Sequence, residues 1–254
     1  RVQGVDVDTD GLLPDRMPKE SPRLVCVTPS HQFPSGAVLS LQRRLELLQY
    51  ARRHDTWILE DDYDGEFRYD SKPLAALRSL DRDGRVLYVG TFSKTLFPSL
   101  RLGYVVMPAA LRQDLVTAKW AQDFGSSAIE QAALAHFMQS GGFERHLRRS
   151  ARTLVERRDA LLEGLRECSK GRLDIADSHA GMHLVVWLRG KKNADLDPIL
   201  AHAQKLGLGL HTIRPHYLRA PEGAGLLMGY CGLSVAQIRE AMPVFARVLD
   251  AAYA

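Results

Sequence analysis

The stretch from Val86 to Tyr104, which reads VLYVGTFSKTLFPSLRLGY, constrains the fold and chemistry of this chain more than any other. It opens with an apolar, β-branched run that ends at Gly90, which is the pattern of a short buried strand. Lys94 follows at once, before a second apolar run from Leu102 to Met107. A lysine between two such strands is expected to be buried or half-buried, and burial favours the uncharged, nucleophilic amine. Such an amine condenses with aldehydes to a Schiff base.

Hydroxyl groups and a guanidinium flank this lysine in the sequence. Thr91 and Ser93 precede it, and Arg101 follows it after a loop that contains Pro98. Short donors together with a bidentate guanidinium are what a phosphate group requires. An amine that can react with an aldehyde, next to groups that can bind a phosphate, indicates a site for pyridoxal 5'-phosphate (PLP). The alternative from this stretch alone is a surface lysine on a strand–loop–strand corner, and both interpretations stand at this point.

Composition places the chain among ordinary globular proteins. Its 254 residues, 45% hydrophobic and 25% charged, suffice for one large domain or two smaller ones. The net charge is only +4, and the arginines between Arg145 and Arg152 are expected to form a solvated helix face rather than a surface for nucleic acid. Three distant cysteines without CxxC spacing predict a reduced, cytoplasmic compartment, with no disulfide framework and no metal site. The chain also lacks an apolar run long enough for a transmembrane helix, so no membrane partner is expected.

Apolar periodicity predicts an α/β fold with a largely parallel sheet. Short strands and one helix alternate along the first half, at residues 24–27, 41–54, 56–59 and 86–89. Continuously apolar strands that alternate with helices are typical of parallel sheets. Ligands of such sheets bind at the carboxyl ends of the strands, and Ser35, Asp61, Tyr63 and Lys94 all fall just past strand ends.

The second half predicts a smaller α+β unit that follows a long helix. Helices are expected at 111–120, 128–138, 143–168, 198–206 and 235–253, and strands at 173–176, 182–188, 208–213 and 225–230. Asp197 is expected to cap the helix at 198–206, and Pro243 to kink or split the closing helix. We therefore divide the chain into the latter part of a large PLP-binding domain, residues 1–142, and a connecting helix with a small C-terminal domain, residues 143–254.

Carboxylates at the second strand end supply the next part of the candidate site. Residues 60–64 read EDDYD, and strand alternation puts Asp61 and Tyr63 on the same side. An aspartate beneath the cofactor can pair with the pyridinium nitrogen, which keeps the ring protonated as an electron sink. Tyr63 can then donate its phenol to the 3-oxygen of the ring. The alternative is a metal-binding or simply solvated acidic turn.

Two further segments leave alternatives open. The loop from His31 to Gly36 either passes near the cofactor ring or is a plain turn fixed by Pro34 and Gly36. Arg214 follows a small-domain strand, where it either binds the carboxylate of an amino acid or is an exposed arginine.

Three motifs together resemble a known family. TPSHQFPSG, EDDYDGEFRY and GTFSKTLFPSLRLGY, in this order, resemble the aminotransferase-like domain of MocR-type regulators, within the GntR group of transcription factors. AGMHLVVWL and LLMGYCGLS resemble the small domain of that family, so the resemblance covers nearly the whole chain. It implies the PLP-dependent transferase fold type I, with a partial large domain and a smaller α+β C-terminal domain.

The resemblance also implies roles for individual residues. Lys94 carries PLP as an internal aldimine, Asp61 faces the pyridine nitrogen, and Tyr63 bonds the 3-oxygen. The phosphate is held by three residues: Thr91, Ser93 and Arg101. Arg214 is assigned to the carboxylate of the substrate. Related aminotransferases carry an asparagine where Phe33 stands, so no bond from this position to the ring oxygen is expected.

Two functions follow from the resemblance. The first is a PLP-binding sensor domain of a transcriptional regulator, which responds to a small amino compound or amino acid by external aldimine formation. The alternative is an aminotransferase of class I/II that transfers an amino group between an amino acid and a keto acid. Both use Lys94, so the site residues leave enzymatic activity open. A cofactor-free α/β domain is the third option.

MocR-type proteins join a winged-helix DNA-binding domain to the aminotransferase-like domain. This sequence shows neither the winged helix nor the first third of the PLP domain, so we expect an N-terminally truncated piece. DNA contact is then expected only through the absent winged helix. The resemblance further implies a homodimer in the intact protein.

Overall fold

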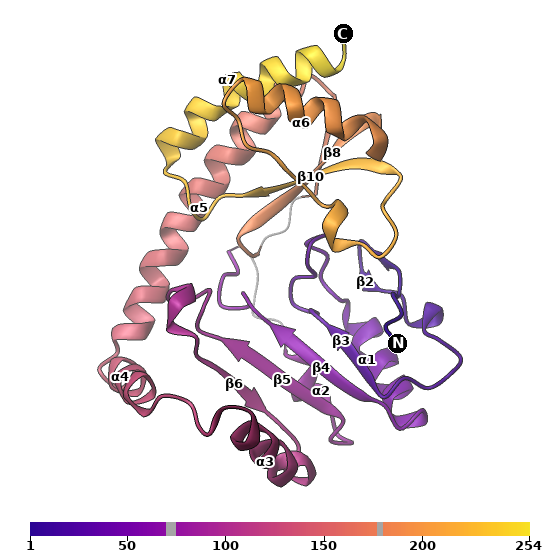
Figure 1. The fold of residues 1–254 in the computed structure, drawn as a ribbon, viewed down its shortest axis with the longest axis vertical. Helices are drawn as coiled ribbons and strands as arrows, with labels where there is room; N and C mark the ends of the chain where they lie inside the picture. The colour runs from indigo at the N-terminus through magenta and orange to yellow at the C-terminus, as the bar shows by residue number, and fades with distance from the viewer. Residues whose placement is uncertain (70–74, 177–179) are drawn as a thin grey trace. The chain divides into compact units, whose positions relative to one another are not determined.

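The structure is a computed structural model that describes residues 1–69, 75–176 and 180–254. The chain forms two compact units (Figure 1). The first comprises Arg1–Gln32, Ala37–Glu66 and Ser71–Arg148, and the second comprises Phe33–Gly36, Phe67–Asp70 and Arg149–Ala254. Two short segments from the first half of the sequence therefore belong to the second unit.

A four-stranded sheet organises the first unit. Its order is β3 (Leu24–Val27), β4 (Trp57–Asp62), β5 (Val86–Thr91) and β6 (Gly103–Val106). The first three strands are parallel, and β6 runs antiparallel to β5. Asp61 lies opposite Val89 and Asp62 opposite Gly90, so the carboxyl ends of β4 and β5 lie at the same edge of the sheet. The mainly parallel sheet confirms the predicted α/β class.

One face of this sheet carries the core of the first unit. Helix α1 (Leu41–Arg53) and the short helix α2 (Leu77–Leu80) pack there. The buried cluster consists of Val25, Val27, Leu39, Leu47, Ala51, Ile58, Leu77 and Val86. Side chains alternate along a strand, so Asp61 lies on the face opposite Ile58. On that opposite face Leu24 is 45% exposed and Cys26 is exposed, whereas Val25 and Val27 of the same strand are buried in the core.

Local polar contacts fix helix α1 to the loops around it. Ser40 accepts a hydrogen bond from the backbone N–H of Arg43 at 3.4 Å, which is the N-cap expected from a serine at this position. Arg44 is only 2% exposed. Its guanidinium donates to the carbonyl oxygens of Leu39 at 2.8 Å, Ala75 at 2.9 Å and Pro29 at 2.8 Å. A buried cation therefore links three backbone segments of the first unit.

The remaining elements of the first unit are shorter or more exposed. They are β1 (Val7–Asp8), β2 (Gly11–Leu12), η1 (Pro14–Arg16), η2 (Pro98–Leu100), η3 (Ala109–Leu111), α3 (Arg112–Asp123) and α4 (Ala128–Gln139). Neither α3 nor α4 buries any of its residues. Trp120 is 59% exposed, Phe124 76% and Ile129 81%, so large apolar side chains of these helices face solvent.

An antiparallel sheet and three long helices form the second unit. The sheet order is β7 (Leu173–Ala176), β8 (His183–Lys192), β10 (Gly223–Gly229) and β9 (His211–Thr212). Helix α5 (Gly142–Ser169) begins in the first unit and continues into the second, where α6 (Leu196–Lys205) and α7 (Val235–Ala252) lie with it against the sheet (Figure 1). The 3-10 turns η4 (Asn193–Asp195) and η5 (Arg214–His216) complete this unit. Leu165, Val186 and Phe245 are among its buried residues.

Three local expectations in the second unit are wrong. Helix α6 begins at Leu196, and Asp197 does not cap it because its carboxylate pairs with Arg214 at 2.8 Å. Pro243 does not split helix α7, which continues from Val235 to Ala252 with buried residues on both sides of the proline, and a kink at Pro243 stays a prediction. The strand expected at 208–213 is reduced to two residues.

Within residues 1–69, 75–176 and 180–254, no helix is both long and apolar enough to cross a membrane.

Candidate functional site

A tight turn at the end of β5 presents the lysine. The backbone N–H of Leu96 donates to the carbonyl of Phe92 at 2.9 Å, which closes one helical turn around Lys94. Thr95 in the same turn is 2% exposed, and its carbonyl oxygen lies 2.8 Å from Nε2 of His146. Thr95 therefore anchors the turn, and Lys94 projects from it.

Lys94 is exposed, so the expectation of a buried or half-buried lysine is wrong for this chain. The two flanking apolar runs do form strands, as expected. The loop between them passes beyond the edge of the sheet, where the face that carries Asp61 has exposed residues. Burial thus extends to Thr95 in the turn but not to Lys94 beside it.

The hydroxyl and guanidinium groups of the predicted phosphate site gather at the same corner. Thr91 pairs with Gly103 in the sheet, and its Oγ1 accepts a hydrogen bond from the N–H of Ser93 at 3.1 Å. The N–H of Phe92 donates to the carbonyl of Leu102 at 3.0 Å, which closes the loop next to Arg101. Arg101 has left-handed backbone angles, φ 51° and ψ 32°, a conformation that is uncommon outside glycine. The fold therefore returns Arg101 to the strand end that carries Thr91.

The adjacent strand end supplies carboxylates on both faces of the sheet. Asp61 is exposed, and partial loss of hydration together with the charges of Asp62 and Asp64 raises the pKa of its carboxyl group. Asp62 accepts a hydrogen bond from the hydroxyl of Tyr88 at 2.7 Å, and its second carboxylate oxygen is buried without a partner among the described residues. This division agrees with the alternation that separates Asp61 from Asp62 in the sequence.

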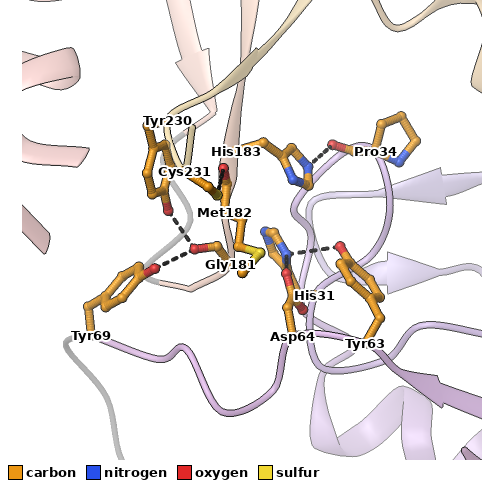
Figure 2. A network of polar contacts seen from close by, with 10 residues as sticks. All are labelled: His31, Pro34, Tyr63, Asp64, Tyr69, Gly181, Met182, His183, Tyr230 and Cys231. Atoms are coloured by element: carbon orange, nitrogen blue, oxygen red, sulfur yellow. Dashed lines mark hydrogen bonds and ion pairs between the residues drawn. The ribbon is translucent and has the colours of Figure 1, made fainter. Parts of the chain in front are cut away.

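A buried histidine–aspartate pair lies against Tyr63 (Figure 2). Nδ1 of His31 lies 2.8 Å from Oδ2 of Asp64, and both side chains are 1% exposed. The hydroxyl oxygen of Tyr63 lies 3.1 Å from the same nitrogen. Burial and the neighbouring Asp64 carboxylate raise the pKa of Tyr63 far above its ordinary value, so its hydroxyl keeps its proton.

The first unit thus brings six of the predicted site residues to one edge of its sheet: Asp61, Tyr63, Thr91, Ser93, Lys94 and Arg101. Within the described residues, four of these side chains have no intramolecular hydrogen bond or ion pair: Asp61, Ser93, Lys94 and Arg101. PLP needs an amine for its aldehyde, a hydroxyl and a guanidinium for its phosphate, and a carboxylate that accepts the proton of its ring nitrogen, and these four groups are not committed elsewhere among the described residues. The residues present therefore fit this cofactor. No group of three or more His, Cys, Asp or Glu side chains in the described ranges is arranged to hold a metal ion.

Arg214 belongs to the second unit, in the turn η5. Its guanidinium donates to Asp197 at 2.8 Å, and its Nε is buried without a partner among the described residues. The assignment of Arg214 to a substrate carboxylate stays a prediction.

The loop from Phe33 to Gly36 also belongs to the second unit. The peptide bond between Phe33 and Pro34 is cis, and the carbonyl of Pro34 lies 2.9 Å from Nε2 of His183. Nearby, the carbonyl of Gly181 accepts hydrogen bonds from Tyr69 at 2.5 Å and Tyr230 at 2.6 Å (Figure 2). These contacts tie two early chain segments to the strand β8 and the turn before it.

The fold and this site define the class of protein. A family model for aminotransferase class I and II matches residues 3–207, and the chain belongs to that family. Two solved structures share the fold. Kynurenine aminotransferase of Pyrococcus horikoshii is 25% identical with a TM-score of 0.88, over 97% of this chain and 63% of that one. LysN of Thermus thermophilus, an alpha-aminoadipate aminotransferase complexed with N-(5'-phosphopyridoxyl)-L-leucine, is 26% identical with a TM-score of 0.88, over 100% of this chain and 66% of that one.

Several relatives of this chain within the family are transcriptional regulators. The probable rhizopine catabolism regulatory protein MocR of Rhizobium meliloti is 38% identical over 92% of this chain and 47% of that protein. The uncharacterized HTH-type transcriptional regulator YhdI of Bacillus subtilis is 37% identical over 91% of this chain and 49% of that protein. The chain therefore spans about half the length of these regulators. The resemblance to the aminotransferase-like domain of MocR-type regulators is confirmed, and the family implies a PLP cofactor.

Sequence reasoning missed the pairing of His31 with Asp64. The sequence pattern predicts a loop around His31 and an acidic run that ends at Asp64, without a contact between them. The sequence holds part of the signal, because both residues follow predicted strands, but the parallel pairing of β3 with β4 that brings them together is seen only in the structure. Polar residues that follow neighbouring parallel strands meet at the same edge.

Proposed function

We propose that this chain is the PLP-binding, effector-sensing domain of a MocR/GntR-type transcriptional regulator. The observation that carries this proposal is the gathering of Lys94 with an uncommitted acid and phosphate-type donors at one sheet edge, in a chain whose relatives include HTH-type regulators. When bound, PLP supplies an aldehyde that captures amines and a ring that withdraws electrons.

Each residue has one task in this proposal. Lys94 would hold the cofactor covalently through its amine, and an effector amine would compete with Lys94 for the same aldehyde. Asp61 holds a proton at the ring nitrogen, and Tyr63 donates its hydroxyl to the ring 3-oxygen. The phosphate is bound by the hydroxyls of Thr91 and Ser93 and the guanidinium of Arg101, whose planar fork suits a phosphate.

The effector and the partners belong to the same proposal. The effector is a small amino compound or amino acid, and Arg214 binds its carboxylate where it has one. The intact protein is a homodimer in the cytoplasm that contacts DNA through a winged-helix domain outside these 254 residues. Free thiols at Cys26, Cys168 and Cys231 support the cytoplasmic location. Exchange of the lysine for an effector amine shifts the balance of conformations that the attached domain senses.

Reduction with borohydride tests the central claim. The chain is incubated with PLP, reduced and digested, and the modified peptide is located by mass spectrometry. We expect the label on Lys94 in wild type, none in Lys94→Ala, and full labelling in the control Lys119→Ala, because Lys119 is an exposed lysine that pairs with Asp123. Equal labelling of Lys94→Ala and wild type would show that another amine holds the cofactor.

Asp61→Asn tests the acid separately. The variant should still be labelled on Lys94, but the dissociation constant for PLP should rise about tenfold, which corresponds to the loss of one charge-assisted hydrogen bond. The constant is measured by titration of the visible absorbance. An unchanged constant would show that Asp61 does not contact the ring nitrogen.

The alternative function is an aminotransferase of class I/II. It is supported by the likeness to solved aminotransferases, with TM-scores of 0.88. Turnover separates the two: an aminotransferase releases a keto acid at rates on the order of 1–10³ per second, whereas a sensor changes its absorbance on binding an amine without steady product release.

A further inference from the structure

The ladder between the strands β10 and β9 ends early. Leu227 pairs with His211, and no further pair follows among the described residues, although β10 continues to Gly229. The end of α6 holds the chain before β9, since the N–H of Leu208 donates to the carbonyl of Ala203 at 2.9 Å. The chain before β9 therefore does not run along β10, and this edge of the sheet is open.

A pocket of about 240 Å³ lies in this opening. Residues 208–211 and the end of β10 line it, together with helices α5 and α7. Helix α7 contributes Ile238, Ala241, Met242 and Phe245, whose spacing of three and four places them on one face of the helix. All of these elements belong to the second unit where they line the pocket.

The lining runs from the interior of the unit to its surface. Ile238 and Phe245 are each 1% exposed, and Leu161 of α5 is 5% exposed. Leu233 is 40% exposed, and His211 is exposed as well. The pocket therefore has a buried floor and an entrance, which distinguishes it from an exposed apolar face.

The chemistry of the lining is apolar. Among the described residues that line the pocket, His211 is the only one with a polar side chain. A charged ligand would give up its hydration for a lining that offers almost no polar partner. Met228 and Met242 also line the pocket, and their flexible thioether side chains adapt to the shape of a ligand. An apolar cavity of about 150 Å³ binds benzene, so this pocket has room for a larger aromatic ring system.

We propose that this pocket is a binding site for a small, uncharged aromatic molecule. The ring of the ligand lies against Ile238 and Phe245 on the floor, and a single polar group reaches His211 at the entrance. The site differs from the proposed cofactor site, because Lys94 and Asp61 belong to the first unit. The proposal goes beyond the sensing of amino compounds and does not require PLP.

Methionine methyl NMR tests the proposal on the whole chain, with indole as the probe and no PLP present. The chain has six methionines, and Met228 and Met242 are the two that line the pocket among the described residues. We expect their methyl signals to shift saturably, with a Kd of about 0.1–1 mM, the range that about nine non-hydrogen atoms give. The other methionine signals should not move. The absence of a saturable shift at both methyl groups up to about 10 mM indole would overturn the proposal.

Two leucine substitutions on α7 locate the site. Ala241→Leu places a larger side chain in the pocket, whereas Ala236→Leu adds the same side chain at an exposed position outside it. Both variants should fold, because leucine favours helices. Ala241→Leu should weaken indole binding about tenfold or more, and Ala236→Leu should leave the Kd unchanged. Equal affinities of the two variants would show that indole binds elsewhere. The methyl shifts of wild type decide the question even where Ala241→Leu does not fold.

A charged analogue and a dilution series separate the other occupants. Indole-3-carboxylate should bind at least about tenfold more weakly than indole, and equal binding would contradict the uncharged ligand class. If the signals of Met228 and Met242 shift with protein concentration in the absence of indole, a second copy of the chain fills the pocket, and the small-molecule site is refuted. Failure of borohydride to fix PLP on Lys94 would refute the proposed function and leave this result unchanged.

Discussion

Replacing Arg44 by methionine should destabilise the first unit strongly. The guanidinium is 2% exposed and donates to three backbone carbonyls, at distances of 2.8, 2.9 and 2.8 Å. Methionine has a similar length but no donor. Each carbonyl that loses its partner in the interior costs about 1–3 kcal/mol. Removing a buried cation returns part of that sum, because the desolvation of a buried ion costs several kcal/mol.

The expected net loss for Arg44→Met is about 3 kcal/mol, a large fraction of the about 5–15 kcal/mol that stabilises a typical domain. Urea denaturation followed by tryptophan fluorescence measures it. Arg53→Met on the same helix is the control, since the side chain of Arg53 is exposed and, among the residues that the structure describes, hydrogen-bonds only to Gln49 at 3.1 Å. That control should stay within about 0.5 kcal/mol of wild type.

Arg44→Lys refines the test. A lysine keeps the charge but has a single ammonium, which cannot reach three carbonyls in the fixed directions of a guanidinium. The free energy of unfolding of Arg44→Lys should lie between those of wild type and Arg44→Met. If Arg44→Met is no less stable than Arg53→Met, the three carbonyl contacts do not stabilise the loop between Pro29 and Leu39, and the reasoning fails.

Two further predictions concern other parts of the first unit. The guanidinium of Arg43 holds the pKa of Asp8 at about 2, below its ordinary 3.8, so this carboxylate contributes stability above pH 3.8 that is lost as the pH falls toward 2. Carbon NMR should give that pKa in wild type and a value near 3.8 in Arg43→Gln, and equal values would contradict the contact. Gly90→Ala should cost about 2 kcal/mol, since a Cβ there would lie 2.3 Å from the ring of Tyr104. Gly229→Ala, where nothing lies within 4 Å, is the control, and equal losses would contradict the packing argument.

The secondary structure around the candidate site could be predicted because its signals are local. An apolar run that ends at Gly90 suffices to indicate β5, and Ser40 before an amphipathic stretch suffices to place the start of α1. The contact of His31 with Asp64 could not be predicted in the same way, because 33 residues separate them. It depends on the pairing of β3 with β4, which periodicity does not specify.

The prediction that Asp197 caps α6 is wrong for a related reason. Asp197 before Pro198 has the local pattern of an N-cap, and a local rule stops there. In the structure its carboxylate binds Arg214, which lies 17 residues further along the chain. The carboxylate of Asp197 therefore pairs with an arginine from another element instead of capping the helix.

The strands beside Lys94 could be predicted and its exposure could not, because the two depend on different faces of the sheet. Each apolar run needs only one packed face to become a strand, and α1 and α2 supply that face for β3, β4 and β5. Burial of the turn after a strand needs a second layer on the other face, and mainly parallel sheets usually have one. Leu24 at 45% exposure and the exposed Cys26 show that the described residues leave that face of β3 largely uncovered. The sequence pattern states which residues are apolar but not what covers them. The strands beside Lys94 could therefore be predicted from it, whereas the environment of the lysine itself could not.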